Sequence, residues 1–209
     1  MAERVFNDQL GDWRRSCYCG EPSAAAVDQE LTLVGWVHGR RDHGGVIFVD
    51  LRDRSGICQI VFNPEGDAVS HEKAKQLRSE DVIAVRGTLV KRSPENINKD
   101  LPTGEVELKS RGLRLLNASQ VPPFIIDDET DANENTRLKY RYLDLRRPQS
   151  LAPLLLRYRM TKLIRDYLDG LGFIDVETPV LTKSTPEGAR DYLVPSRIYH
   201  GKFYALPQS

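Results

Sequence analysis

The chain has 209 residues, and its 30 basic and 30 acidic side chains cancel to a formal net charge of zero, so overall charge gives no argument for a polyanionic partner. Its 3 cysteines lack the two paired ligands of a zinc site, and no apolar run approaches the length of a membrane span. Together with the absence of a signal-peptide pattern, this predicts a soluble cytoplasmic protein with no metal site and no membrane partner.

The first half of the chain has the period-two alternation of β-structure. Residues 1–28 are interpreted as a loosely ordered lead-in with one short helix. The alternation then predicts five strands, at residues 31–38, 46–52, 57–62, 81–91 and 105–109. A basic, glycine-containing turn at 39–45 joins the first two, and a helix at 71–78 separates the third and fourth. Three strands, a helix and two strands is the order of an OB-fold barrel.

One aromatic side chain falls on the polar face of this barrel. The alternation places Phe48 on the outer face, with Gln59 as a neighbour on the next strand and Arg92 and Glu107 on the same side. An aromatic ring beside an amide and arginines is typical of single-stranded nucleic-acid binding, through stacking, hydrogen bonding and phosphate attraction. The alternative is an ordinary strand with one exposed phenylalanine, and the alternation alone leaves both open.

A change in composition marks a boundary after the barrel. Residues 122–135 begin with two prolines and are acidic, whereas residues 137–148 (RLKYRYLDLRRP) are basic. Two interpretations remain for the basic part: a solvated helix face, which the charge pattern favours, or a hinge that contacts a polyanion.

The last part of the chain predicts mixed structure. Residues 151–171 have the three-to-four spacing of a long amphipathic helix, and residues 172–181 predict a strand that contains Pro179. A charged loop at 182–196 follows, and another strand begins at 203. The roughly sixty residues after the basic segment are too few for a self-sufficient catalytic core.

Several of these stretches together resemble one family. The sequences GWVHGRRDHGGVIFVDLRD, RLKYRYLDLRRP, GFIDVETPVL and TPEGARDYLVPS are similar to those of bacterial-type aspartyl-tRNA synthetases, over nearly all of the chain beyond residue 29. The resemblance implies a β barrel plus an α+β part. Residues 1–121 would be the lead-in and anticodon-binding OB-fold, 122–147 a hinge, and 148–209 the incomplete start of a class II catalytic domain built on an antiparallel sheet.

The resemblance also implies roles for residues of the barrel. Phe48 would stack on the central anticodon base, and Gln59 would hydrogen-bond its edge. Glu107 would accept hydrogen bonds from a base such as the first anticodon guanine. The implied anticodon-binding set is Arg41, Phe48, Gln59, Arg92, Asn96 and Glu107.

Two positions are associated with the choice between tRNA-Asp and tRNA-Asn in this family. His43 resembles the relaxed enzymes that accept both, but Asn96 is not the small residue that accompanies it there. We therefore favour relaxed specificity. The alternative is that His43 is simply a solvated turn residue.

In the catalytic part, Glu187 would pair with the ammonium group of aspartate, Ser209 would begin a substrate-binding run, and Pro179 would belong to a homodimer interface. The expected substrates are L-aspartate, ATP with Mg²⁺, and tRNA-Asp, with tRNA-Asn in the relaxed case. The family's two adenylate-stabilising arginines match no residue of this sequence. The chain is thus expected to be an amino-terminal fragment with no catalytic residue, no bound cofactor and no activity of its own.

Two other functions compete with an aspartate–tRNA ligase. One is an OB-fold module that binds tRNA or single-stranded nucleic acid without chemistry, and the other is an asparaginyl-tRNA synthetase. The loop TPEGARDYLVPS argues against both, because a pure binding module needs no amino-acid lid and the asparaginyl enzymes differ in this loop.

Overall fold

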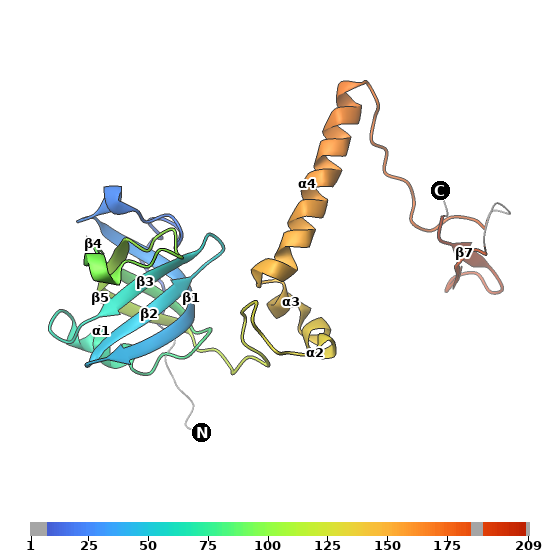
Figure 1. The fold of residues 1–209 in the computed structure, drawn as a ribbon. Helices are drawn as coiled ribbons and strands as arrows, with labels where there is room; N and C mark the ends of the chain where they lie inside the picture. The colour runs from blue at the N-terminus through green and yellow to red at the C-terminus, as the bar shows by residue number, and fades with distance from the viewer. Residues whose placement is uncertain (1–7, 185–189, 208–209) are drawn as a thin grey trace. The chain divides into compact units, whose positions relative to one another are not determined.

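The structure is a computed structural model that describes residues 8–184 and 190–207. The chain divides into two compact units, Met1–Ile125 and Ile126–Ser209 (Figure 1). Within the described ranges, no helix combines the length and the apolar character that crossing a bilayer requires.

The first unit is a closed five-stranded barrel. Its strands are β1 (Glu30–His43), β2 (Val46–Arg52), β3 (Ile57–Phe62), β4 (Val82–Lys91) and β5 (Val106–Asn117). They are ordered β1-β2-β3-β5-β4, with β4 also paired to β1, and every pairing is antiparallel except that between β3 and β5. Helix α1 (Ala68–Ala74) lies between β3 and β4 in the sequence, which confirms the predicted OB-fold order.

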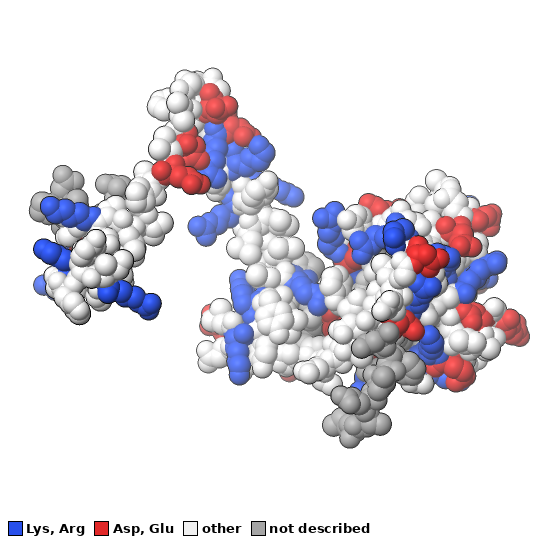
Figure 2. Space-filling view, turned by 180° about the vertical axis from the view of Figure 1, so that it is seen from behind, with Lys and Arg blue, Asp and Glu red and all other residues white. Residues whose placement is uncertain are grey.

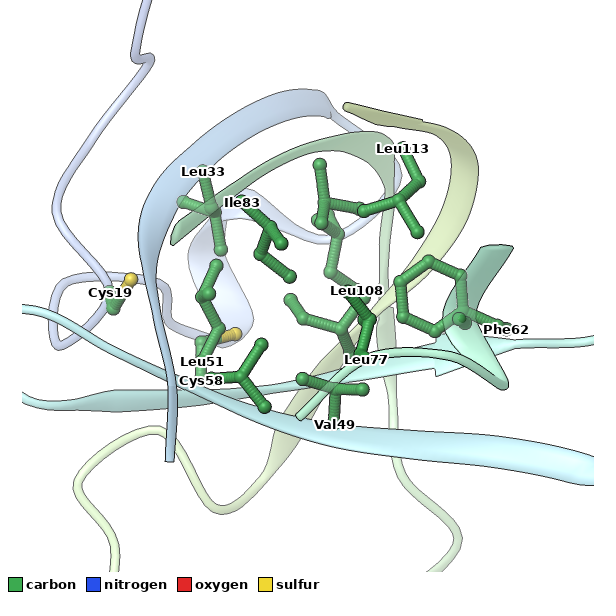
Figure 3. Close-up of a cluster of buried hydrophobic side chains, with 14 of the residues drawn as sticks. Cys19, Leu33, Val49, Leu51, Cys58, Phe62, Leu77, Ile83, Leu108 and Leu113 are labelled. Atoms are coloured by element: carbon green, nitrogen blue, oxygen red, sulfur yellow. The ribbon is translucent and has the colours of Figure 1, made fainter. Parts of the chain in front are cut away.

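Apolar side chains at alternate positions of the strands form the barrel core. Ile47, Val49 and Leu51 of β2 are fully buried, and the side chains between them are half-buried on the outer face. Leu33, Cys58, Phe62, Ile83 and Leu108 point into the same interior (Figure 3). The buried face of β2 is thus opposite to Phe48, as the period-two pattern predicted.

The turn between β1 and β2 is shorter than predicted. The expected turn at 39–45 is wrong, because β1 continues to His43 and only Gly44 and Gly45 connect the strands. Both glycines have positive φ angles, 61° and 83°, as a two-residue type I′ hairpin turn requires. The polar residues that suggested a loop are instead paired across the ladder, with Arg41 opposite Phe48.

The predicted bounds of α1 and β5 were also wrong. Helix α1 begins earlier than residue 71 because the Asp67 carboxylate caps it, accepting a hydrogen bond from the Ser70 backbone N–H at 3.1 Å. Strand β5 runs eight residues past 109, to Asn117, and pairs with β4 along its length. The register between β4 and β5 shifts at Arg86 and Gly87 of β4, and this shift interrupts the alternation along β5. The sequence pattern therefore predicts too short a strand.

The described part of the lead-in is packed against the barrel, contrary to the expectation of loose order. Cys19 is fully buried, and Trp13 is 9% exposed. The Ser16 N–H donates to the Thr32 carbonyl at 2.9 Å, and the Cys19 N–H donates to the Asp53 carboxylate at 2.8 Å. The expected short helix is the 3₁₀ turn η1 (Ala24–Ala26).

The second unit begins with an acidic and a basic segment that bind each other. Helices α2 (Glu134–Lys139), α3 (Arg141–Asp144) and α4 (Pro148–Gly170) follow one another. The buried Arg147 guanidinium donates to the Asp144 carboxylate at 2.7 Å and to the Asp127 carbonyl at 2.7 Å. Burial opposes ionisation of Asp144, but the hydrogen bond and charge of Arg147 prevail and lower its pKa.

The predicted long helix is present as α4, but the predicted strand at 172–181 is not formed. Pro179 is exposed, and the nearest backbone pairing is an isolated bridge between Thr182 and Ala205. A strand needs the edge of another strand for its hydrogen bonds, and the described residues offer 172–181 none. Within the predicted loop, β6 (Leu193–Pro195) pairs with β7 (Phe203–Ala205) instead.

Candidate nucleic-acid interface

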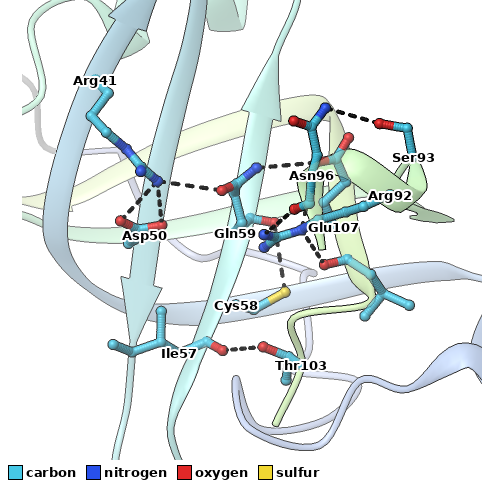
Figure 4. Close-up of polar contacts among 11 residues, drawn as sticks. Arg41, Asp50, Ile57, Cys58, Gln59, Arg92, Ser93, Asn96, Thr103 and Glu107 are labelled. Carbon is cyan, nitrogen blue, oxygen red and sulfur yellow. Dashed lines mark hydrogen bonds and ion pairs between the residues drawn. The ribbon is translucent and has the colours of Figure 1, made fainter. Parts of the chain in front are cut away.

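A row of polar side chains crosses the outer face of the barrel from β1 to β5 (Figure 4). Arg41 on β1 donates to the Asp50 carboxylate at 3.0 Å and to the Gln59 amide oxygen at 3.3 Å. The Gln59 amide nitrogen donates to the Glu107 carboxylate at 3.0 Å. The closed barrel brings these four residues together from four different strands, so the predicted residues Arg41, Gln59 and Glu107 form one contiguous site.

Gln59 is less accessible than the alternation predicted. It faces away from the core, yet only 9% of its surface is exposed, because Arg41 and Glu107 contact its amide from either side. These contacts use one hydrogen-bonding position on each end of the amide. The amide oxygen keeps one lone pair and the amide nitrogen one N–H with which to bind a ligand.

Phe48 lies diagonally across the strand pair from Gln59. The direct partner of Phe48 on β3 is Val61, and that of Gln59 on β2 is Asp50. Side chains at such diagonal positions are about 7–8 Å apart, which is within reach of an aromatic ring. The half-buried Phe48 ring thus borders the polar row and offers a face on which a base can stack.

Arg92 closes the row on the side of the loop that follows β4. Its side chain is 4% exposed, and its Nε donates to the Val106 carbonyl at 3.0 Å and lies 3.8 Å from the Glu107 carboxylate. Its buried Nη2 has no hydrogen-bond partner among the described residues. A buried guanidinium nitrogen without an acceptor is costly, so this atom marks a position where a ligand acceptor would be stabilised.

The two residues predicted to discriminate between tRNAs, Asn96 and His43, lie at the ends of different segments. Asn96 closes the 3₁₀ turn η2 (Pro94–Asn96); its amide donates to the Ser93 hydroxyl at 2.9 Å, and its carbonyl accepts from Arg92 at 3.5 Å. His43 is exposed at the last paired position of β1, opposite Val46, and not within a turn as predicted.

The sequence reasoning did not select Asp50 or Ser93. Asp50 orients the Arg41 guanidinium beside Gln59, and Ser93 holds the Asn96 amide. The alternation that placed Phe48 outside also places Asp50 on the same face, so the sequence contained a signal for Asp50. The bond from Asn96 to Ser93 depends on the local 3₁₀ turn and had no such signal.

Cys58 lies beneath the site and is unsuited to chemistry there. Burial raises the pKa of its thiol to about 12, against a smaller opposing effect of Arg92. The thiol therefore stays protonated at neutral pH and is a poor nucleophile or metal ligand. In the described ranges, no three His, Cys, Asp or Glu side chains are grouped so as to hold a metal ion.

The predicted aspartate-binding residues cannot be placed. Glu187 and Ser209 lie outside the described residues. On the face of the barrel seen in Figure 2, basic and acidic side chains are interspersed. Among the residues that the structure describes, this face of the barrel therefore carries no large patch of one charge sign.

Two family descriptions match the chain in succession. Residues 31–116 match the OB-fold nucleic acid binding domain, and residues 133–209 match the class II tRNA synthetases of the D, K and N group. The first match covers the strands of the barrel, and the second contains α4. In these two ranges the chain is similar to an OB-fold nucleic acid binding domain and to the class II tRNA synthetases.

Curated relatives narrow the resemblance to one kind of synthetase. The aspartate–tRNA(Asp/Asn) ligase of Syntrophotalea carbinolica is 56% identical over 97% of this chain and 34% of the relative. The ligase of the same name from Halothermothrix orenii is 57% identical over the same shares. This chain is thus a homologue of bacterial aspartate–tRNA(Asp/Asn) ligases and spans about a third of their length.

Solved structures show the same fold. The asparaginyl-tRNA synthetase from Pyrococcus horikoshii with asparaginyl-adenylate has a TM-score of 0.77 and 27% identity, over 92% of this chain and 42% of that one. The aspartyl-tRNA synthetase from Entamoeba histolytica has a TM-score of 0.68 and 18% identity, over 78% of this chain and 40% of that one. At 18% identity the second likeness concerns the fold alone.

Proposed function

We propose that the outer face of the barrel binds the anticodon of tRNA-Asp, and that the whole protein is an aspartate–tRNA ligase. The observation that carries the proposal is the buried Arg92 guanidinium at the end of the polar row that begins at Arg41: its Nη2 has no partner among the described residues, and its Nε lies 3.8 Å from the Glu107 carboxylate. A donor and an acceptor fixed side by side suit the edge of a nucleobase better than a phosphate, because a carboxylate repels phosphate.

Guanine is the base that fits this pair. Its Watson–Crick edge presents the O6 acceptor next to N–H donors, so Arg92 would donate to O6 while Glu107 accepts from the N–H groups. The Gln59 hydrogen bond orients the Glu107 carboxylate for this contact. The first base of the aspartate anticodon GUC would take this position, as the family resemblance implies.

The central uracil would bind between Phe48 and Gln59. The Phe48 ring would stack on the base, and the free lone pair and N–H of the Gln59 amide would match the alternating donors and acceptors on the edge of uracil. Arg41 would stay beside Gln59 as a fixed positive charge near the backbone, held by Asp50.

For the whole protein we infer the activation of L-aspartate with ATP and its transfer to tRNA-Asp, also to tRNA-Asn in the relaxed case. The names of the relatives, which include both tRNAs, support relaxed specificity. Glu187 and Ser209 would bind aspartate, and Pro179 would lie in a homodimer interface. No group of described residues fits the Mg²⁺ that accompanies ATP, so no step through it is derived for this chain.

Anisotropy titrations of labelled anticodon hairpins test the proposal. The chain should bind a GUC hairpin at least about tenfold more tightly than one with a changed central base, GAC, which corresponds to about 1.4 kcal/mol. Glu107→Gln should weaken GUC binding more than binding of an AUC hairpin, because guanine presents the N1–H donor to the carboxylate where adenine presents the N1 acceptor. Equal affinity for all three hairpins would contradict the proposal.

A further inference from the structure

The tip of the β1–β2 hairpin carries little packing of its own. Gly44 and Gly45 form it, and a Cβ added to either would meet no atom within 4 Å. His43, the proposed discrimination residue, immediately precedes this tip and is exposed. Glycines are conformationally permissive, so contacts made by the tip help to set the position of His43 at the end of the β1–β2 ladder.

A buried histidine on helix α1 makes a hydrogen bond to the tip of the hairpin. His71 of α1 has a side chain that is 5% exposed, and its Nε2 lies 2.7 Å from the Gly45 carbonyl oxygen. A carbonyl can only accept, so Nε2 carries the proton and donates. The other side-chain bond to the tip in the described structure is from the Gly45 N–H to Asp42 at 3.2 Å, and it lies within the hairpin itself.

Helix α1 holds His71, the donor of this anchoring hydrogen bond to Gly45, in place. Its first turn is capped by Asp67, and Ala74 in its last turn is fully buried against the barrel. Lys73 also pairs with Asp8 of the lead-in at 3.1 Å. The donor nitrogen of His71 is therefore held by a packed helix, and the flexible element of the contact is the glycine tip.

We infer that His71 is a positioning residue for tRNA discrimination: its hydrogen bond to Gly45 sets where His43 lies relative to the third anticodon base. The inference rests on the proposed anticodon-binding function. His71 does not contact the RNA in this scheme and acts through the hairpin backbone. Its loss should therefore change the preference between GUC and GUU hairpins more than it changes recognition of the central base.

Two measurements on the same chain test this. Amide hydrogen exchange of residues 42–47 reports the anchor without any RNA, and anisotropy titrations give the ratio of the GUC and GUU dissociation constants. His71→Leu should speed exchange at the tip by about fivefold or more and change the ratio by about threefold or more. His71→Gln keeps an N–H donor and should restore both values to within about twofold of the unmodified chain.

Ala74→Gly is the matched control, because it loosens the same helix without removing the donor to Gly45. It should lower stability and leave the GUC to GUU ratio unchanged. If His71→Leu does not fold, His71→Asn, whose amide is too short to reach Gly45, replaces it.

Unchanged exchange at the tip in the Leu or Asn variant would overturn the inference. Faster exchange at the tip with an unchanged ratio of the GUC and GUU dissociation constants would also overturn it. The same holds if Ala74→Gly changes this ratio as much as the His71 variant does. Failure of the unmodified chain to bind either hairpin would refute the proposed function, and with it the role in discrimination. Exchange at the tip would then still show whether the anchor exists.

Discussion

Gln59 lies at the centre of the polar row, with Arg41 on one side and Glu107 on the other. It accepts from Arg41 at 3.3 Å and donates to Glu107 at 3.0 Å, so it orients both charged groups in addition to its proposed contact with a base. A residue with both tasks should affect base recognition more than overall stability, because its charged partners are also held by Asp50 and lie near Arg92.

Gln59→Ala should weaken binding of the GUC hairpin by about 1–3 kcal/mol and reduce the preference for a central uracil over adenine. Anisotropy titrations with GUC and GAC hairpins measure both effects. Gln120→Ala, the same change at an exposed position, is the control and should alter neither. A loss seen only in the urea midpoint of Gln59→Ala would indicate a purely structural side chain.

Asp53 is a residue whose charge stabilises the fold. Burial opposes its ionisation, but hydrogen bonds from the Ser55 hydroxyl and backbone and from the Cys19 N–H outweigh burial and lower its pKa below the ordinary 3.8. A lowered folded-state pKa means that stabilisation is present above the unfolded value and is lost as the pH falls through the folded value.

Asp53→Asn should therefore cost about 1–3 kcal/mol of unfolding free energy at pH 7, because an amide nitrogen cannot accept the bonds that one carboxylate oxygen accepts. The cost should shrink as the pH is lowered from about 5 to about 3. Urea unfolding across this pH series measures it, with Asp100→Asn at an exposed position as the control. A difference independent of pH would show that the charge of Asp53 does not contribute.

At the scale of the structural elements, the lead-in packs on the barrel through an aromatic ring that contacts two cationic side chains. The Trp13 ring has Arg114 at 4.2 Å and Arg86 at 4.7 Å from its centre, both contributed by the β4–β5 pair. The same ring lies so close to Gly112 that a Cβ there would be 3.0 Å from it. Gly112, which lies next to the register shift in β5, is thus the place where the lead-in packs.

Trp13→Ala should destabilise the barrel by about 2–4 kcal/mol, through loss of the buried ring and of two cation–π contacts. Protease cleavage within residues 8–28 should become faster at the same time, since the segment loses its main contact. Thermal unfolding and limited proteolysis measure the two effects. Gln9→Ala, an exposed residue of the same segment, should change neither, and a stable, protease-resistant Trp13→Ala would contradict this account.

At the scale of the whole molecule, the proposed binding site and the expected catalytic activity depend on different parts of the protein. The proposed anticodon site is built within one barrel, whereas the chain spans about a third of the length of its ligase relatives. Adenylate formation needs arginines and Mg²⁺ to stabilise the charge that develops on the phosphate, and the sequence contains no match to the family's two arginine motifs.

We therefore expect the chain to bind the GUC hairpin and to show no aspartate-dependent exchange of pyrophosphate into ATP. The exchange assay with and without L-aspartate measures this, and hairpin binding by the same preparation shows that the protein is active in recognition. Measurable aspartate-dependent exchange would contradict the prediction.

Local patterns predicted much of the barrel. The bounds of β2 and β3 were predicted correctly, because short strands between turn residues alternate without interruption. The full length of β1 and β5 was not, because a two-glycine turn and a register shift depend on pairing with another strand. The strand expected at 172–181 is absent for the same reason: strand formation is decided by a partner.

For the candidate site, the sequence by itself determined the residue types and the face on which Phe48, Gln59 and Glu107 lie, since side-chain direction follows from backbone period. Only the tertiary structure decided that Arg41 bonds to Gln59, that Arg92 keeps a buried nitrogen without a partner, and that His71 reaches the hairpin tip. The two bonds join residues 18 and 26 positions apart in the sequence. Pairing of β1, β2 and β3 and packing of α1 bring these residues within hydrogen-bonding distance, and no local pattern encodes either.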